Sequence, residues 1–342
     1  MSKSPKLVCK NVWKLYGDNP KEFLQSHNNN PDKKTIESAG YIQAIRNASL
    51  EVYENEILVI MGLSGSGKST LVRCMSRLVD PTIGEIFFEN IDMGKLTKNE
   101  LIEIRRHKMG MVFQHFALFP HRTVIENIAF PLEVQGINKK EREKSASEII
   151  ELVGLQGREN YFPRELSGGQ QQRVGIGRSL AVKPELWFLD EPFSALDPLI
   201  RKEMQDEFLR LQSSLKKTIM FVTHDFDEAL KLADRIAIMK DGIIEQLDTP
   251  ANIVLSPATE YVKKFTQEVP REKVLKIEAV MYQKNEDHNL SDFTVSKDAI
   301  IETVAEKILG QEKSVPVVDD DNNKVGIINP TKIIQILFGE KK

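Results

Sequence analysis

The strongest constraint on the fold is a glycine-rich segment that directly follows a continuous apolar run. The run covers residues 57–61, and the segment reads Gly62-Leu63-Ser64-Gly65-Ser66-Gly67-Lys68-Ser69, which fits the GxxxxGK[ST] pattern of a phosphate-binding loop. An apolar run without polar alternation is typical of a strand buried on both faces of a parallel sheet. The pattern therefore predicts an α/β fold that binds a nucleoside triphosphate.

The residue types of this loop indicate which groups meet the phosphates. Glycines allow successive backbone N–H groups to converge on phosphate oxygens beside the N-terminus of a following helix, which we expect over residues 70–78. Lys68 supplies a cation for the β- and γ-phosphates, and the Ser69 hydroxyl suits Mg²⁺. The candidate nucleotide-binding residues of the segment are Gly62, Ser64, Gly65, Ser66, Gly67, Lys68, Ser69 and Thr70.

Two further apolar runs, residues 186–189 and 219–222, predict two more buried strands. Each ends in polar residues, as expected where α/β sheets place their ligands at the carboxyl ends of the strands. Asp190 and Glu191 follow the first run. We predict that Asp190 organises Mg²⁺ and that the catalytic Glu191 orients or deprotonates the attacking water.

A second anion-facing segment, Leu166-Ser167-Gly168-Gly169-Gln170, precedes a predicted helix. A phosphate loop followed by LSGGQ resembles the ATP-binding cassette (ABC) family. The ATPases of that family close as head-to-tail dimers and hold ATP between one subunit's phosphate loop and the other subunit's LSGGQ. The resemblance implies ATP and Mg²⁺ as cofactors and a homodimer with two competent sites. It makes Ser167, Gly168, Gly169 and Gln170 nucleotide-binding residues.

The same resemblance assigns roles to three more residues. Gln114, after Met111-Val112-Phe113, matches the glutamine that touches Mg²⁺ and the attacking water, in a loop that faces the transmembrane partner. His224 matches the γ-phosphate contact, and Tyr16 matches the aromatic side chain that stacks on adenine. Catalysis is thus expected from Glu191, His224 and Gln114, and metal binding from Ser69, Gln114 and Asp190.

Within the family, residues 1 to about 268 are most similar to the ATP-binding subunit of glycine betaine/proline betaine importers. The match is carried by residues 59–67, 193–201 and 234–239 and by a polar insertion after Gly17, in which we expect one short helix near residues 22–25. The resemblance implies an ATPase that drives uptake of glycine betaine or a related methylated amine (proline betaine, choline, trimethylamine N-oxide) through a separate permease. An importer ATPase for another small solute, such as an amino acid, stays open, as does a soluble ABC ATPase of DNA repair or translation.

The rest of the chain indicates a helical segment, a hairpin and a separate tail. We expect an N-terminal antiparallel β subdomain with strands over residues 7–13 and 45–52, and a hairpin over residues 235–247. We expect a helical subdomain over residues 96–178, with one amphipathic helix over residues 139–152. We place the ABC ATPase domain at residues 1–268 and a small α+β unit at residues 269–342.

The tail resembles a single cystathionine-β-synthase-type (CBS) module, which the betaine subfamily carries as a pair. Asn329 and Lys332 occupy the positions at which such modules hold a ribose with Thr/Ser and Asp, so we do not expect an adenine-nucleotide sensor. We expect instead a regulatory or dimerising unit that leaves four apolar side chains exposed when alone: Val317, Ile327, Ile334 and Leu337.

Bulk properties limit the partners. A net charge of −3 and a pI near 6.2 create no field that attracts nucleic acid, and two cysteines indicate a reduced compartment. No apolar run approaches the roughly 18–20 residues of a membrane span. The resemblance to importer ATPases then implies a peripheral protein on the cytoplasmic face of the bacterial inner membrane. Its expected partners are a second copy, a transmembrane permease and, indirectly, a periplasmic or extracellular substrate-binding protein.

Overall fold

The computed structural model describes residues 4–114, 116–267, 269–283 and 290–338, and it divides into two compact units, Met1–Leu247 and Asp248–Lys342. The first unit contains an antiparallel sheet of order β2-β1-β4-β5 and a six-stranded sheet of order β10-β9-β3-β8-β7-β6. The antiparallel strands are β1 (Pro5–Tyr16), β2 (Ile42–Tyr53), β4 (Ile83–Phe88) and β5 (Ile91–Asp92). The six-stranded sheet consists of β3 (Ile57–Met61), β6 (Met109–Val112), β7 (Leu186–Asp190), β8 (Thr218–Thr223), β9 (Arg235–Lys240) and β10 (Ile243–Asp248).

The parallel part of the larger sheet fixes the position of the functional residues. Strand β3 pairs in parallel with β8 and β9, and β7 pairs in parallel with β6 and β8. Every residue of β3, β7 and β8 is buried, which confirms the three strands predicted from their apolar runs. Because the strands run in one direction, the polar residues that follow β3, β7 and β8 meet at one edge of the sheet.

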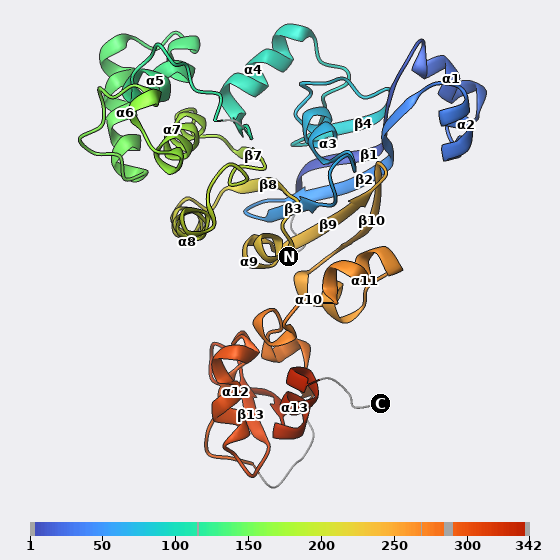
Figure 1. Cartoon of the computed structure of the whole chain (residues 1–342), viewed down its shortest axis with the longest axis vertical. Coiled ribbons are helices and arrows are strands. Elements are labelled where there is room, and N and C mark those ends of the chain that lie inside the picture. The colour runs from blue at the N-terminus through green and yellow to red at the C-terminus, as the bar shows by residue number, and fades with distance from the viewer. Residues whose placement is uncertain (1–3, 115, 268, 284–289, 339–342) are drawn as a thin grey trace. The chain divides into compact units, whose positions relative to one another are not determined.

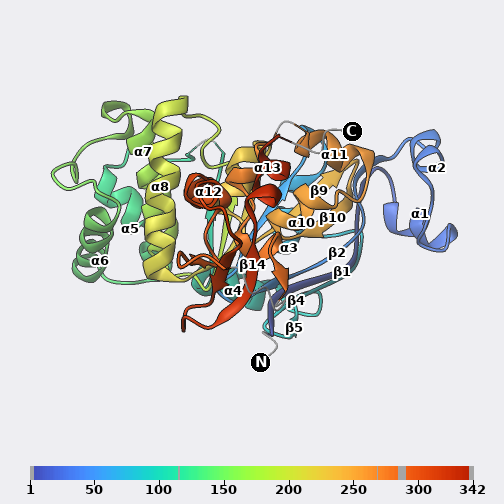
Figure 2. The same cartoon turned by 90° about the horizontal axis from the view of Figure 1, so that it is seen from below.

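Helices cover the sheets and form a separate group at one end of the first unit. They are α1 (Pro20–Ser26), α2 (Lys33–Ser38), α3 (Lys68–Met75), α4 (Lys98–Lys108), α5 (Val124–Val134), α6 (Lys139–Leu152), the 3₁₀ turn η1 (Pro163–Glu165), α7 (Gly168–Leu180), α8 (Pro198–Leu215) and α9 (Phe226–Leu232). Helices α5, α6 and α7 lie together, whereas α1 and α2 lie at the opposite end of the unit (Figures 1 and 2). The predicted antiparallel and helical subdomains are both present.

The insertion after Gly17 contains two helices, so the expectation of a single helix near residues 22–25 is wrong. The expected helix is α1, and the additional one is α2, whose N-terminus is capped by the Asp32 side chain accepting from Thr35 N at 2.7 Å. Leu24 of α1 and Ile36 of α2 pack into a small apolar cluster with Trp13 and Leu15 of β1.

The second unit is built on a four-stranded sheet of order β11-β14-β13-β12. Its elements are α10 (Pro250–Leu255), α11 (Glu260–Thr266), the 3₁₀ turns η2 (Arg271–Lys273) and η3 (Ile277–Ala279), β11 (Tyr282–Gln283), β12 (Val295–Ser296), α12 (Ile301–Leu309), β13 (Val315–Val318), β14 (Lys324–Ile328) and α13 (Pro330–Phe338). The boundary expected after residue 268 falls inside this unit, since Ala251 of α10 already packs against its core.

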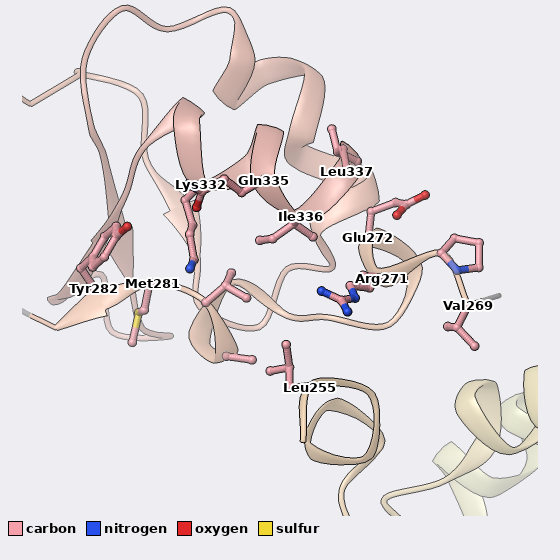
Figure 3. A pocket seen from close by; sticks show the side chains of 13 residues that line it. Leu255, Val269, Arg271, Glu272, Met281, Tyr282, Lys332, Gln335, Ile336 and Leu337 are labelled. Carbon is pink, nitrogen blue, oxygen red and sulfur yellow. The ribbon is translucent and has the colours of Figure 1, made fainter. Parts of the chain in front are cut away.

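The expectation that four apolar side chains of the tail are exposed is wrong for two of them. Val317 is fully buried and Ile327 is 6% exposed, because β11 pairs with β14 opposite Ile327 and Met281 lies against Gly326. Ile334 is exposed, and Leu337 is half-buried. This unit contains an open cavity of about 830 Å³. The side chains of Arg271 and Lys332 lie at its wall (Figure 3).

Candidate nucleotide site

The segment between β3 and α3 forms a tightly packed loop. Gly67 caps α3 with φ 99°, and a Cβ placed there would lie 2.2 Å from the Ala44 carbonyl oxygen. Gly62 is equally confined, because its Cβ would lie 2.2 Å from the Met239 carbonyl oxygen. Gly65, with φ 79°, faces open space, since no atom lies within 4 Å of its Cβ position. The loop is therefore fixed on its inner side and open where a phosphate would approach.

Lys68 lies beneath this loop. Its Nζ donates to the Gly62 carbonyl at 2.8 Å and to the Leu63 carbonyl at 3.0 Å. Burial lowers the pKa of Lys68, although the charges of Glu191 and Asp190 oppose the shift. An ammonium group carries three donors, and these two bonds occupy two of them. The arrangement fits a phosphate that supplies both the third acceptor and a compensating negative charge.

Ser64, Ser66 and Thr70 complete the predicted loop residues and lie in different surroundings. Ser64 is exposed and Thr70 half-buried. Ser66 is 5% exposed, and within the described part of the chain its Oγ has no hydrogen-bond partner. That hydroxyl lies beneath the loop, 2.7 Å from the position a Gly62 Cβ would take.

Ser69 and Asp190 meet, as predicted. Ser69 Oγ, in the first turn of α3, donates to Asp190 Oδ1 at 2.8 Å, and Arg73 Nη2 lies 3.8 Å from Asp190 Oδ2. Asp190 ends β7 and is 4% exposed. Burial raises the pKa of this carboxyl, although the Ser69 hydrogen bond and the charge of Arg73 act in the opposite direction. A hydroxyl and a carboxylate together offer the oxygen ligands that Mg²⁺ prefers.

The three predicted catalytic residues also meet, on one carboxylate oxygen. Glu191 Oε2 lies 3.1 Å from Gln114 Nε2, which donates to it, and 3.2 Å from His224 Nδ1. Glu191 has the unusual φ of 47°, and hydrogen bonds on both sides of the residue hold it: its N–H donates to Val222 O, and its carbonyl accepts from Ser194 Oγ. Non-glycine residues in this conformation cluster at functional sites.

Tyr16 occupies the last position of β1 and is 44% exposed. The ammonium group of Lys14 lies 4.9 Å from the centre of its ring. The ring is thus held at the rim of the antiparallel sheet with its surface accessible, which suits stacking against a planar ligand.

The LSGGQ segment forms a capped helix start away from the phosphate loop. Ser167 Oγ accepts from Gln170 N at 3.3 Å, and Gln170 Oε1 accepts from Ser167 N at 3.0 Å, so the pair forms a capping box at the N-terminus of α7. Ser167 and Gly168 are exposed, whereas Gly169 is buried close to Ile200. Figure 1 places α7 with α5 and α6, apart from α3. The exposed N-terminus of α7 is therefore open to an anion held by another molecule.

Sequence reasoning missed Arg73, which lies near Asp190. The signal was present, because Arg73 comes four residues after Ser69 and such positions share one face of a helix. Arg73 becomes noticeable only when β7 brings Asp190 alongside α3.

Comparisons with known proteins identify the family. A family model described as ABC transporter matches residues 45–194. The trimethylamine N-oxide transport system ATP-binding protein TmoW of Pelagibacter ubique is 66% identical over 338 residues, which are 99% of each chain. The glycine betaine transport ATP-binding protein OpuAA of Bacillus subtilis is 51% identical over 79% of this chain and 65% of its own.

A solved structure shares the fold of most of the chain. The ATP-binding cassette MJ0796, described as a dimer in a post-hydrolysis state bound to ADP and Pi, superposes with a TM-score of 0.59 and is 36% identical. The match covers 71% of this chain and 98% of that one. The chain therefore belongs to the ABC transporter family, as an ATP-hydrolysing ATP-binding subunit homologous to those of glycine betaine, proline betaine and trimethylamine N-oxide transport systems.

Proposed function

We propose that this chain supplies the energy for importing trimethylamine N-oxide through a separate permease. The observation that carries the proposal is the 66% identity to TmoW over 99% of both chains, which includes the second unit. The match to OpuAA covers only 65% of that protein's length. Glycine betaine is the second candidate solute, favoured by 51% identity over the shared part.

The proposed ATP site combines the phosphate loop, Tyr16 and the Ser69–Asp190 pair. The loop N–H groups and Lys68 bind the phosphates, and the Tyr16 ring stacks on adenine. Ser69 and Asp190 hold Mg²⁺, with Gln114 as a further ligand; when bound, the ion neutralises charge on the β- and γ-phosphates. The closeness of Ser69 and Asp190, 2.8 Å between oxygens, supports this assignment.

Hydrolysis is assigned to the three residues that meet at Glu191. The Glu191 carboxylate accepts a proton from the attacking water, Gln114 orients that water, and the His224 ring contacts the γ-phosphate. The shared contacts at Glu191 Oε2, 3.1 Å from Gln114 and 3.2 Å from His224, support a single catalytic group of three.

A head-to-tail homodimer completes each site. The exposed start of α7 at Ser167 and Gly168 then faces the ATP held by the other subunit's Lys68, and Gly169 and Gln170 shape the helix start. None of the helices in the described part of the chain is long and apolar enough to cross a membrane. The similarity to ATP-binding proteins of transport systems supports a subunit that binds a permease peripherally on the cytoplasmic face, with a substrate-binding protein that delivers the solute. We assign residues 269–342 as a CBS-like regulatory or dimerising unit.

Uptake in living cells tests the solute assignment. In Ruegeria pomeroyi cells that lack their own TmoW, expression of this chain should restore uptake of radiolabelled trimethylamine N-oxide, whereas the Glu191→Gln variant should not. Escherichia coli cells that lack ProV, the ATP-binding protein of their glycine betaine/proline betaine transport system, provide the matched test for glycine betaine. Rescue of betaine uptake in the second strain without rescue in the first would contradict the proposal.

A further inference from the structure

The insertion between β1 and β2, residues 17–41, has no part in the site as described so far. We propose that this insertion positions both ends of the bound nucleotide. At the adenine end, Tyr41, the last residue of the insertion, holds the backbone of Tyr16 in place. At the phosphate end, Lys33 of α2 acts on the phosphate loop through the turn Asp241-Gly242. The proposal rests on the roles proposed above for Tyr16 and the phosphate loop.

The contact at the base end is between Tyr41 and Gly17. A Cβ placed on Gly17 would lie 2.4 Å from Cδ1 and 2.8 Å from Cε1 of Tyr41, so the ring rests directly on the Gly17 backbone. Tyr16 is the adjacent residue and forms the last β1–β2 pair with Ile42. The Tyr41 hydroxyl donates to the Asp18 carbonyl, and its ring stacks on Phe23 of α1 with centroids 4.3 Å apart. The backbone that carries Tyr16 is thus clamped by the insertion.

The contact at the phosphate end passes through Gly242. The Gly242 N–H donates to the Ser66 carbonyl at 2.9 Å, and its carbonyl accepts from Arg46 N at 2.8 Å. One residue therefore links the phosphate loop to β2. Gly242 has φ 78°, and a Cβ there would lie 2.9 Å from the Ala44 carbonyl oxygen and 3.1 Å from Ile45 Cα. A side chain at position 242 must displace the turn and with it the donor to Ser66.

The insertion reaches this turn through Asp241. Lys33 Nζ lies 3.2 Å from Asp241 Oδ2, and Gln43 Nε2 donates to the Asp241 carbonyl at 2.6 Å. The two charged side chains are about half exposed, 48% and 51%, and exposed ion pairs of this kind contribute little by themselves. The ring of Tyr41 and the backbone of Gly242 therefore carry most of the effect, and the ion pair adds a smaller tether.

Two ligands allow the contacts at the adenine end and at the phosphate end to be tested separately in the full-length protein. Calorimetry with a non-hydrolysable ATP analogue reports on base and phosphates together, whereas inorganic tripolyphosphate reports on the phosphate end alone. Base–aromatic stacking contributes about 1–3 kcal/mol. Tyr41→Ala should therefore weaken binding of the ATP analogue about fivefold or more and leave the affinity for tripolyphosphate unchanged. Tyr41→Phe keeps the ring and should bind the analogue within about twofold of wild type.

Gly242→Ala should weaken both ligands by a similar factor, because it acts on the phosphate loop. Lys33→Ala should weaken tripolyphosphate binding about twofold, whereas Lys34→Ala, which changes the neighbouring exposed lysine, should have no effect. Equal tripolyphosphate binding by these two variants overturns the role of the insertion at the phosphate loop. If Tyr41→Ala weakens binding of both ligands equally, or of neither, the proposed role of Tyr41 at the adenine end is wrong. If Gly242→Ala binds tripolyphosphate as tightly as wild type, the proposed role of Gly242 at the phosphate loop is wrong.

Tyr16→Ala distinguishes failure of this inference from failure of the site assignment. If Tyr16→Ala leaves the affinity for the analogue unchanged, the stacking role of Tyr16 is wrong. The proposed role of Tyr41 at the adenine end is then wrong as well. If Tyr16→Ala weakens the analogue and Tyr41→Ala does not, Tyr16 keeps its role and the insertion has none at the base.

Discussion

Replacing Glu191 with glutamine should stop ATP hydrolysis without preventing ATP binding. In the native protein, Glu191 Oε2 lies 3.1 Å from Gln114 Nε2 and 3.2 Å from His224 Nδ1. Glutamine has nearly the same shape and offers an amide oxygen in place of Oε2. The hydrogen bonds that hold the residue at φ 47° come from its backbone and persist. The substitution therefore removes a proton acceptor and a negative charge with little change in geometry.

The expected loss is set by the missing proton acceptor. General-base catalysis typically contributes about 10²–10⁴ in rate, which corresponds to about 3–5 kcal/mol of the barrier. Phosphate release under saturating ATP measures the turnover number, and light scattering measures ATP-dependent dimerisation, which should persist. Glu203→Gln, an exposed glutamate on α8, is the matched control. A Glu191→Gln turnover number within about fivefold of wild type would refute the base assignment, because the expected loss is far larger.

Three other predictions concern stability, assembly and the tail. Burial raises the pKa of Glu228 despite its hydrogen bonds, so the folded state holds that proton at a higher pH than the unfolded state and stability falls as pH rises between the two pKa values. Glu228→Gln should therefore raise the thermal denaturation midpoint at pH 8, and this gain should vanish below pH 4.5, the ordinary pKa of a glutamate. An equal gain at pH 8 and below pH 4.5 would contradict this. Mixing Lys68→Ala and Ser167→Arg protomers, each inactive alone, should restore about a quarter of wild-type ATPase activity, since half the dimers then have one intact composite site; no recovery would rule out sites shared in this way. The full-length Lys68→Ala protein should bind AMP no tighter than about 1 mM by calorimetry, because Lys332 replaces the acid expected to hold a ribose; micromolar binding would contradict this expectation.

The sequence was informative where residue type and spacing report burial directly. The apolar runs that form β3, β7 and β8 identified the strands, and the parallel arrangement then placed Asp190, Glu191 and His224 at one edge. Helix α6 was expected over residues 139–152, the bounds observed, because a charged start is followed by regularly spaced apolar residues.

Features that depend on distant segments were not predictable in the same way. Helix α2 buries only Ile36, so it has no apolar stripe, although its Asp32 cap was a local signal. The expected exposure of Val317 and Ile327 ignored β11, a two-residue strand with no pattern of its own. The link from Gly242 to Ser66 joins residues far apart in the chain, and only the folded structure shows it.

Reconstitution measures the central claim most directly. The chain, its permease and the matching substrate-binding protein would be placed in lipid vesicles with ATP on the side of this subunit, and ATP hydrolysis and solute accumulation would be followed together. Trimethylamine N-oxide should stimulate hydrolysis and accumulate only with active Glu191, with glycine betaine less effective. Stimulation by glycine betaine or an amino acid but not by trimethylamine N-oxide would contradict the account.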